Sequence, residues 1–249
     1  MCELFGLNGT IELNLTPCLK EFFSHSTEHP DGWGIFNIDK DEIIKEPLPA
    51  YESSLVKTLI SSPYKALNMF AHIRQATKGS MIYENAHPFR KTDGLGRVWT
   101  FMHNGTVFDF PRLDVYKESQ LGATDSERIL WYLTEAVNDV SDEELPKVLA
   151  DTIRDMTPNN KLNLMFYDGN NTYVHTNMKS TLYYAAVKRN DNTATLFSTA
   201  PLKALHELDD IVVTEDWTPL PLSKLDIVNN GWHIFLKDIC TYATFSNAS

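Results

Sequence analysis

The order of apolar and polar positions predicts many short strands joined by turns, with helices grouped between them. Apolar or alternating runs in the first half of the chain indicate strands at residues 1–8, 33–38, 42–45, 66–74 and 98–103. The same pattern recurs in the second half at residues 162–167, 172–175, 182–187, 194–198 and 231–236. This order of elements favours an α+β fold with antiparallel sheets.

Helical spacing of apolar residues predicts helices at 16–24 and 53–60 and two more in the middle of the chain. The third follows Thr124-Asp125-Ser126-Glu127, which has the form of a capping box. In this motif the Thr124 hydroxyl accepts the amide of Glu127, and the Glu127 carboxylate reaches back. Ser141 with Glu144 is expected to open the fourth helix, whose apolar positions are Leu145, Val148, Leu149 and Ile153.

Composition and charge narrow the function classes. The 249 residues contain no repeat, low-complexity tract or linker, so we expect one domain over residues 1–249. The net charge of −11 disfavours nucleic acids and membrane surfaces as partners. No apolar run approaches the ~18 residues of a membrane-spanning helix, and no basic residue precedes Lys20, as a signal peptide requires. Cys2, Cys18 and Cys240 lack disulfide-framework spacing, which predicts reduced thiols in the cytoplasm.

Cys2 is the first candidate for chemistry. Removal of Met1, which a small second residue permits, leaves a thiol and a free α-amine on one residue. An α-amine titrates near pH ~8, so it can act as a base close to neutral pH. A nucleophile beside its own terminal amine is a known way to activate a weak attacking group. A buried structural cysteine in the first strand is the alternative.

Two polar segments interrupt apolar runs. In the segment Ala71 to Thr77, strand alternation places His72 and Arg74 on one face. A buried arginine needs an anionic partner, either a ligand carboxylate that matches its planar fork or an internal carboxylate such as Asp125. In the segment Phe101 to Thr106, Asn104 and Gly105 offer adjacent donors suited to an oxyanion. Alternatively, Asn-Gly forms a hairpin turn that ends the strand.

The remaining motifs are weaker. His29-Pro30-Asp31-Gly32-Trp33-Gly34 predicts a tight turn that opens a strand. His25 and His29 have a spacing compatible with a metal but no obvious third ligand. His72, His87 and His103 are expected to be satisfied core histidines or walls of a site. Because no phosphate loop, Cys-x-x-Cys pair or calcium loop is present, we expect neither metal nor cofactor.

In this order the segments resemble the class II glutamine amidotransferases, which belong to the N-terminal nucleophile hydrolases. The matching segments are Met-Cys at the start, HPDGWG, AHIRQAT, NAHPF at 85–89, HNG and TDSE. They are densest over residues 1–130. The chain is most similar to the short, standalone bacterial type without a fused synthase domain. The resemblance implies a four-layer αββα sandwich of two antiparallel sheets.

The resemblance also implies roles for single residues. Cys2 corresponds to the nucleophile, and Asn104 with Gly105 to the oxyanion hole. Arg74 corresponds to the residue that binds the α-carboxylate of glutamine, and Asp125 to the acid that takes its α-ammonium group. Gly32, Trp33 and Gly34 match a strand edge lining the glutamine pocket. His72, His103 and Thr77 match residues that support the site.

The implied reaction is attack of Cys2 on the side-chain amide of glutamine, which releases ammonia and, through a thioester, glutamate. A separate synthase subunit is expected as ammonia acceptor if the chain is a true amidotransferase. Three alternatives stay open at this point. The same nucleophile could serve a γ-glutamyl peptidase or amidase, Cys2 could pair with His72 or His103 in a cysteine hydrolase, or the chain could be a non-catalytic glutamine-binding regulator.

Overall fold

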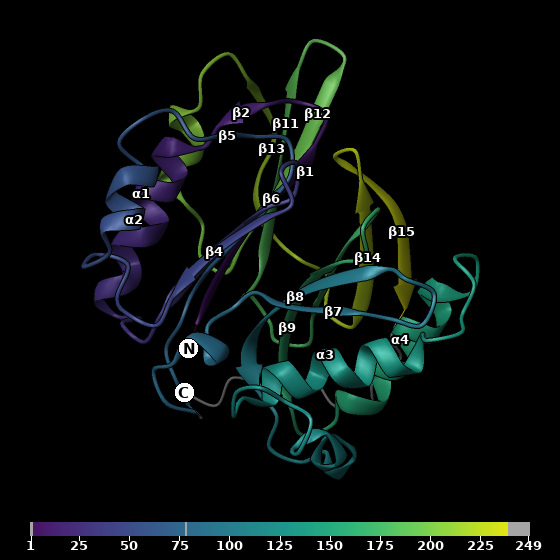
Figure 1. Cartoon of the computed structure of the whole chain (residues 1–249). Coiled ribbons are helices and arrows are strands. Elements are labelled where there is room, and N and C mark those ends of the chain that lie inside the picture. Colours follow the sequence, from purple (N-terminus) through teal and green to yellow (C-terminus); the bar gives the residue numbers. More distant parts are fainter. Residues whose placement is uncertain (1, 78, 239–249) are drawn as a thin grey trace.

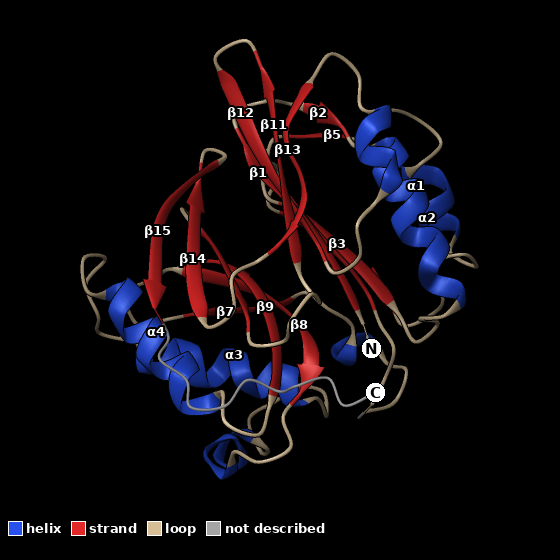
Figure 2. Ribbon diagram, turned by 180° about the vertical axis from the view of Figure 1, so that it is seen from behind, coloured by secondary structure: helices blue, strands red, loops and turns tan. Residues whose placement is uncertain are grey.

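Two antiparallel sheets lie face to face, and a layer of helices covers the outer side of each. The computed structural model describes residues 2–77 and 79–238. Helices α1 (Thr16–Ser24) and α2 (Ser54–Leu59) cover the first sheet, whereas α3 (Asp125–Ala136) and α4 (Leu145–Met156) cover the second (Figure 1). This arrangement is the αββα sandwich expected from the resemblance, and it has four layers (Figure 2).

The first sheet has seven strands in the order β13-β11-β12-β1-β6-β3-β4. Their bounds are β1 Glu3–Gly9, β3 Trp33–Asn37, β4 Glu42–Glu46, β6 Met69–Ile73, β11 Tyr183–Arg189, β12 Asn192–Ser198 and β13 Val212–Pro219. The second sheet has six strands in the order β15-β14-β10-β9-β8-β7. Their bounds are β7 Phe89–Thr92, β8 Val98–Thr106, β9 Lys161–Tyr167, β10 Thr172–Thr176, β14 Lys224–Asn229 and β15 Trp232–Asp238.

Short elements complete the described chain. A two-stranded ladder joins β2 (Leu13–Asn14) to β5 (Lys65–Ala66). The 3₁₀ helices are η1 (His25–Thr27), η2 (Tyr83–Asn85), η3 (Pro111–Tyr116) and η4 (Lys203–Glu207). Among the residues described, no helix is long and apolar enough to cross a membrane.

Strand alternation separates three apolar clusters. The face of β1 that carries Phe5 and Leu7 packs under α1 and α2. The opposite face carries Leu4, which meets Met102 and Met165 of the second sheet. The outer face of the second sheet packs against α3 and α4 through residues such as Leu164 and Ile129. Cys2 precedes Leu4 by two positions, so alternation directs it toward the interface between the sheets.

Most expected elements are confirmed, with shifted ends. The expected strand at 66–74 is divided into β5 and β6, and residues 89–92, 212–219 and 224–229 form strands that the pattern did not predict. The capping box is half confirmed: Thr124 accepts the Glu127 amide, but the Glu127 carboxylate accepts the amides of Leu121 and Gly122. Helix α4 begins at Leu145, after the turn that Ser141 and Glu144 form.

The alternative interpretation of Asn104-Gly105 as a hairpin turn is wrong. Strand β8 continues through Thr106, with Asn104 opposite Asn163 and Gly105 opposite Leu162 in β9. A Cβ atom on Gly105 would lie 1.9 Å from the carbonyl oxygen of Lys161. Glycine is therefore required here by the close approach of the neighbouring backbone, rather than by a turn.

Candidate active site

Cys2 lies at the entry to β1, beside the end of β6. Its Sγ atom accepts the amide of Gln75 at 3.4 Å and lies 3.5 Å from the carbonyl oxygen of the same residue. Burial raises the pKa of this thiol, and the Gln75 hydrogen bond and the charge of Arg74 oppose this effect only in part. Cys2 is therefore mainly a neutral thiol at neutral pH, and a base has to remove its proton before it attacks.

Arg74 is buried immediately after β6, as the alternation of apolar positions predicts. Its guanidinium donates to the carbonyl oxygens of Asp31, Gly79 and Ser80 at 3.1 to 3.3 Å. No ion pair joins Arg74 to Asp125 within the described structure. The internal Arg74–Asp125 pair considered above is therefore not formed. These carbonyl oxygens orient the guanidinium. Burial lowers the pKa of Arg74, and the nearby charges of Cys2 and Asp31 oppose this effect. The planar fork of the guanidinium has the geometry to bind a carboxylate.

Asp125 is the first residue of α3 and is 5% exposed. One carboxylate oxygen accepts the amide of Val107 at 2.7 Å, and the other accepts the amide of Ser126 at 3.1 Å. The carboxylate thus accepts two backbone amides at the N-terminus of α3. A cavity of about 310 Å³ opens beside it, lined in part by Val107, Phe108 and Arg128.

Strand β8 brings Asn104 and Gly105 toward the end of the molecule where Thr77 and Asp125 lie. Its last residue, Thr106, contacts the hydroxyl of Thr77 at 3.4 Å, which links it to the segment after Arg74. Val107 follows at once and binds Asp125. Asn104 is 3% exposed, and its Oδ1 atom is buried without a hydrogen-bond partner in the described structure. Strands β1 and β8 come from different sheets and contact one another.

The segment 31–34 lies next to Arg74. The Gly32 carbonyl accepts the Arg74 amide at 2.8 Å, and Gly32 has a φ of +135°, which side chains rarely adopt. The Trp33 indole instead packs into the cluster under α1 and donates to Glu46. Only its backbone is therefore available to line a pocket on the site side.

Gly34 makes room for a segment that crosses the sheet. A Cβ atom here would lie 2.0 Å from the carbonyl oxygen of His87. Lys45, opposite Gly34 on β4, donates to the carbonyl oxygens of Ala86 and Pro88 at 2.7 and 3.3 Å. Burial lowers the pKa of Lys45 to about 8. The Asn85–Phe89 motif is thus held across the strands beside the site.

The expected satisfied histidines are only partly confirmed. His103 has partners at both ring nitrogens, the Ser126 hydroxyl and the Lys161 carbonyl, each at 3.0 Å. His72 and His87 stack with centroids 4.0 Å apart, and all of their ring nitrogens are buried without a hydrogen-bond partner among the described residues. Burial lowers the pKa of His72 to about 3 and that of His87 well below its usual value. Both rings are therefore neutral.

Sequence reasoning missed a cluster beside the nucleophile. The Glu3 carboxylate contacts His25 and His29, the pair considered above for a metal. Cys18 is buried and unpaired, as expected for a structural thiol, whereas Cys240 lies outside the described residues.

Solved structures share this architecture. A Bacillus subtilis glutamine phosphoribosylpyrophosphate amidotransferase superposes with a TM-score of 0.64 at 16% identity, over 96% of this chain and 49% of that one. A Pseudomonas aeruginosa structure described as a predicted glutamine amidotransferase gives a TM-score of 0.62 at 22% identity, over 94% and 100% of the two chains. The fold is that of the N-terminal nucleophile amidotransferases, as the sequence resemblance implied.

The family follows from the sequence comparison. The model of the class-II glutamine amidotransferases matches residues 1–225, and the chain belongs to this family. An Escherichia coli relative, YafJ, named provisionally as a glutamine amidotransferase, is 34% identical over 53% of this chain. The alignment spans 54% of YafJ. The uncharacterized Methanocaldococcus jannaschii protein MJ1515 is 28% identical over 94% of this chain and 71% of its own length.

Proposed function

We propose that this chain hydrolyses the side-chain amide of glutamine, with Cys2 as nucleophile after removal of Met1. The observation that carries the proposal is the Cys2 thiol held at the backbone of Gln75, the residue after the buried guanidinium of Arg74. A thiol next to a fixed cation suits a substrate that carries a carboxylate at one end and a reactive carbonyl at the other.

The base in this proposal is the α-amine of Cys2 itself. Burial keeps Cys2 protonated, so a proton acceptor is needed. His103 is poorly placed for this role because both of its ring nitrogens are occupied. His72 forms no hydrogen bond to the Cys2 sulfur within the described structure, and its pKa of about 3 makes it a weak base. These observations favour the terminal amine over a Cys–His pair.

Each step then has a group to support it. The Cys2 sulfur forms a bond to the amide carbon of glutamine, and the proton of the thiol passes to the α-amine. Negative charge develops on the amide oxygen, where the Asn104 side chain and the Gly105 amide donate hydrogen bonds. The C–N bond breaks, and ammonia leaves with the proton from the amine. Water then hydrolyses the thioester to glutamate and restores the thiol.

The amino-acid end of glutamine is bound by opposite charges. We assign its α-carboxylate to Arg74 and its α-ammonium group to Asp125, while Thr77, His72, His103 and residues 32–34 support the pocket. The proposal places the reaction in the cytoplasm, where the thiol stays reduced. Ammonia transfer to an acceptor would take place in a separate synthase subunit.

The test is intact-mass analysis before and after treatment with a diazo-ketone analogue of glutamine. We expect loss of the Met1 mass and one adduct, mapped to Cys2. The variant Cys2→Ala should take no adduct, and Cys18→Ala should be labelled as the wild type is. Retention of Met1 on a protein that is still labelled at Cys2 would refute the terminal-amine mechanism. A processed protein that takes no adduct and releases no ammonia from glutamine would refute the activity.

A further inference from the structure

Glu3 adjoins the nucleophile in sequence but faces the other side of the sheet. Alternation along β1 places its side chain with Phe5 and Leu7, toward α1 and α2. The Glu3 side chain is 15% exposed. Such a carboxylate is costly to bury unless polar groups satisfy it.

Two histidines satisfy this carboxylate. His25 Nδ1 lies 2.8 Å from Glu3 Oε2, and His29 Nε2 lies 3.3 Å from Glu3 Oε1. His25 follows α1 directly, and His29 precedes the turn at Gly32 that leads into β3. A single carboxylate therefore ties the start of β1 to both ends of the segment 25–29.

The cluster carries charge. Burial raises the pKa of Glu3, but hydrogen bonds from His25 and His29 outweigh it and lower the value to about 2. The hydrogen bond to Glu3 raises the pKa of His25 despite its partial burial, and Glu21 and Glu28 add to the effect. Glu3 is thus an anion throughout the neutral range, and the contact to His25 is strengthened by charge.

The backbone around Cys2 is otherwise held by β6 and by Thr199. Pairing of β1 with β6 begins at Glu3, opposite Ile73, whereas pairing with β12 begins only at Phe5. Leu4 is held by Thr199 through its amide and its carbonyl. In the proposed enzyme Cys2 is the chain end, and chain ends lose order unless they are anchored.

We propose that Glu3, held by His25 and His29, is a positioning residue that fixes the Cys2 thiol and α-amine in line with the substrate. This inference rests on the proposed function. Its physical basis is that a displacement of about 1 Å at a reacting group can cost a factor of about 100 in rate. The three side chains (Glu3, His25 and His29) act from behind the strand and touch neither substrate nor thiol.

The test compares Glu3→Gln with Glu143→Gln, a change at an exposed carboxylate outside the cluster. For Glu3→Gln we expect kcat for glutamine to fall about 10- to 100-fold, with KM within about twofold of the wild type. Glu143→Gln should match the wild type in both kcat and KM. Glu3→Asp keeps the negative charge but has a shorter side chain, so its kcat should lie between those of the wild type and Glu3→Gln.

Two alkylation rates separate positioning from simple loss of structure. Iodoacetamide needs only an accessible thiol, whereas the diazo-ketone analogue needs the thiol aligned with the pocket. In Glu3→Gln the rate with the analogue should fall while the rate with iodoacetamide is retained. His29→Gln should reproduce this pattern. The double variant His29→Gln/Glu3→Gln should lose little more than either single variant, because both changes disrupt the same cluster.

The outcomes for the two proposals are distinct. An inactive wild type that takes no adduct would refute the proposed function itself. An active wild type together with a Glu3→Gln variant of equal kcat and equal labelling rates would refute only the positioning role. Equal loss of both labelling rates, in step with the fraction unfolded by circular dichroism, would also refute it.

Discussion

At the scale of single residues, three side chains near the candidate site carry buried polar atoms that lack partners within the described protein. Asn104 Oδ1 is buried without a hydrogen bond, and so are both nitrogens of His72 and His87. Buried polar groups usually have partners, and those that lack them often mark functional sites. These three side chains are therefore candidates for a functional role.

The Asn104 amide provides the sharpest residue-level prediction. Asn104→Ala removes a donor to the developing oxyanion, so kcat should fall about 100- to 1,000-fold, equivalent to about 2.7–4 kcal/mol of barrier. Steady-state ammonia release measures this, and Asn170→Ala, at an exposed turn, serves as control. An unchanged kcat in Asn104→Ala would remove this residue from the oxyanion hole.

What the sequence could predict at this scale has a physical limit. Arg74 stands out in the sequence because a cation ends an apolar strand, and the structure shows that it is buried. The cluster at Glu3 could not be found in this way, because His25 is 22 residues away and no periodic pattern links them. Likewise, Asn-Gly favours a turn locally, but the contact of Gly105 with the Lys161 backbone keeps the strand extended.

At the scale of elements, helices were easier to predict than strands. Helix α1 begins and ends as predicted because its apolar spacing is local. Strand β13 lies at an edge of its sheet, and most of its residues are exposed or half-buried, so it lacks the apolar run that marks a buried strand. Helix α3 connects the site to a distant part of the fold. It begins at Asp125, and its C-cap residue Val137 lies beside the β7–β8 hairpin.

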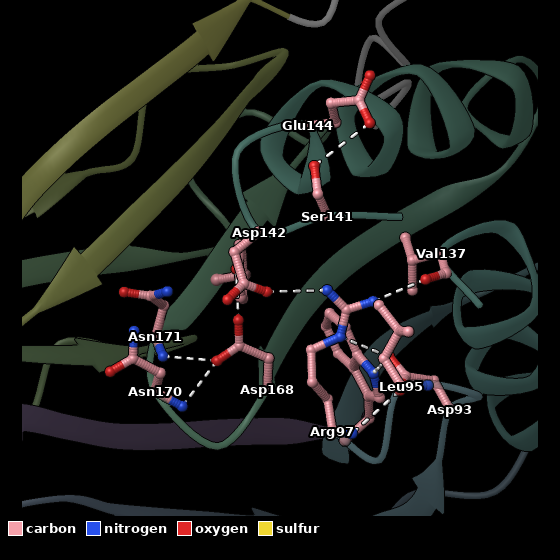
Figure 3. A network of polar contacts seen from close by, with 12 residues as sticks. Asp93, Leu95, Arg97, Val137, Ser141, Asp142, Glu144, Asp168, Asn170 and Asn171 are labelled. Atoms are coloured by element: carbon pink, nitrogen blue, oxygen red, sulfur yellow. Dashed lines mark hydrogen bonds and ion pairs between the residues drawn. The ribbon is translucent and has the colours of Figure 1, made fainter. Parts of the chain in front are cut away.

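A polar network fixes that second end (Figure 3). Arg97 donates to Asp93 at 2.6 Å, to the Val137 carbonyl at 2.7 Å and to Asp142 at 3.1 Å. Trp99 also donates to the Asp93 carboxylate. Burial raises the pKa of Asp93, but the hydrogen bonds from Trp99 and Arg97 outweigh this effect. The pKa is therefore lowered, and Asp93 is an anion.

Removing Arg97 should therefore destabilise the fold without changing the chemistry. Arg97→Ala leaves the buried Asp93 carboxylate without its cation, and we expect a loss of about 3–5 kcal/mol in the free energy of unfolding. Asp142→Asn, at a side chain that is 91% exposed, should change it by less than about 1 kcal/mol. Urea denaturation measures both.

The activity of the folded Arg97→Ala fraction should equal that of the wild type. Helix α3 has 12 residues and so separates Arg97 from Asp125 by about 18 Å. A loss of kcat in the folded fraction would show that a change at the C-terminal end of α3 alters the site at its N-terminal end.

At the scale of the whole molecule, several buried histidines stay neutral in the fold. Burial lowers the pKa values of His72 to about 3 and of His175 to about 4, and it also lowers those of His87 and His103. Unfolding returns each imidazole to a pKa near 6.5. The unfolded chain therefore binds more protons below about pH 6.5, and stability falls as the pH falls.

Replacing one of these rings should flatten that decline. His87→Phe keeps an aromatic ring against His72 and Phe89 but cannot take up a proton. Between about pH 5.5 and 4, the slope of unfolding free energy against pH should decrease by about 1.4 kcal/mol per pH unit. Denaturant unfolding at a series of pH values checks this, and parallel curves for the two proteins would contradict it.

The crossing at Gly34 has a consequence for mutational scanning. A carbonyl oxygen 2.0 Å from the added Cβ cannot rotate away as a side chain would, so every substitution at Gly34 should displace the Ala86–Pro88 backbone and the stacked histidines. In a library scored by activity alone, Gly34 would rank with Cys2 and Asn104. Scoring the same library for soluble expression would separate them, because Cys2→Ala and Asn104→Ala should accumulate normally while Gly34 variants should be depleted.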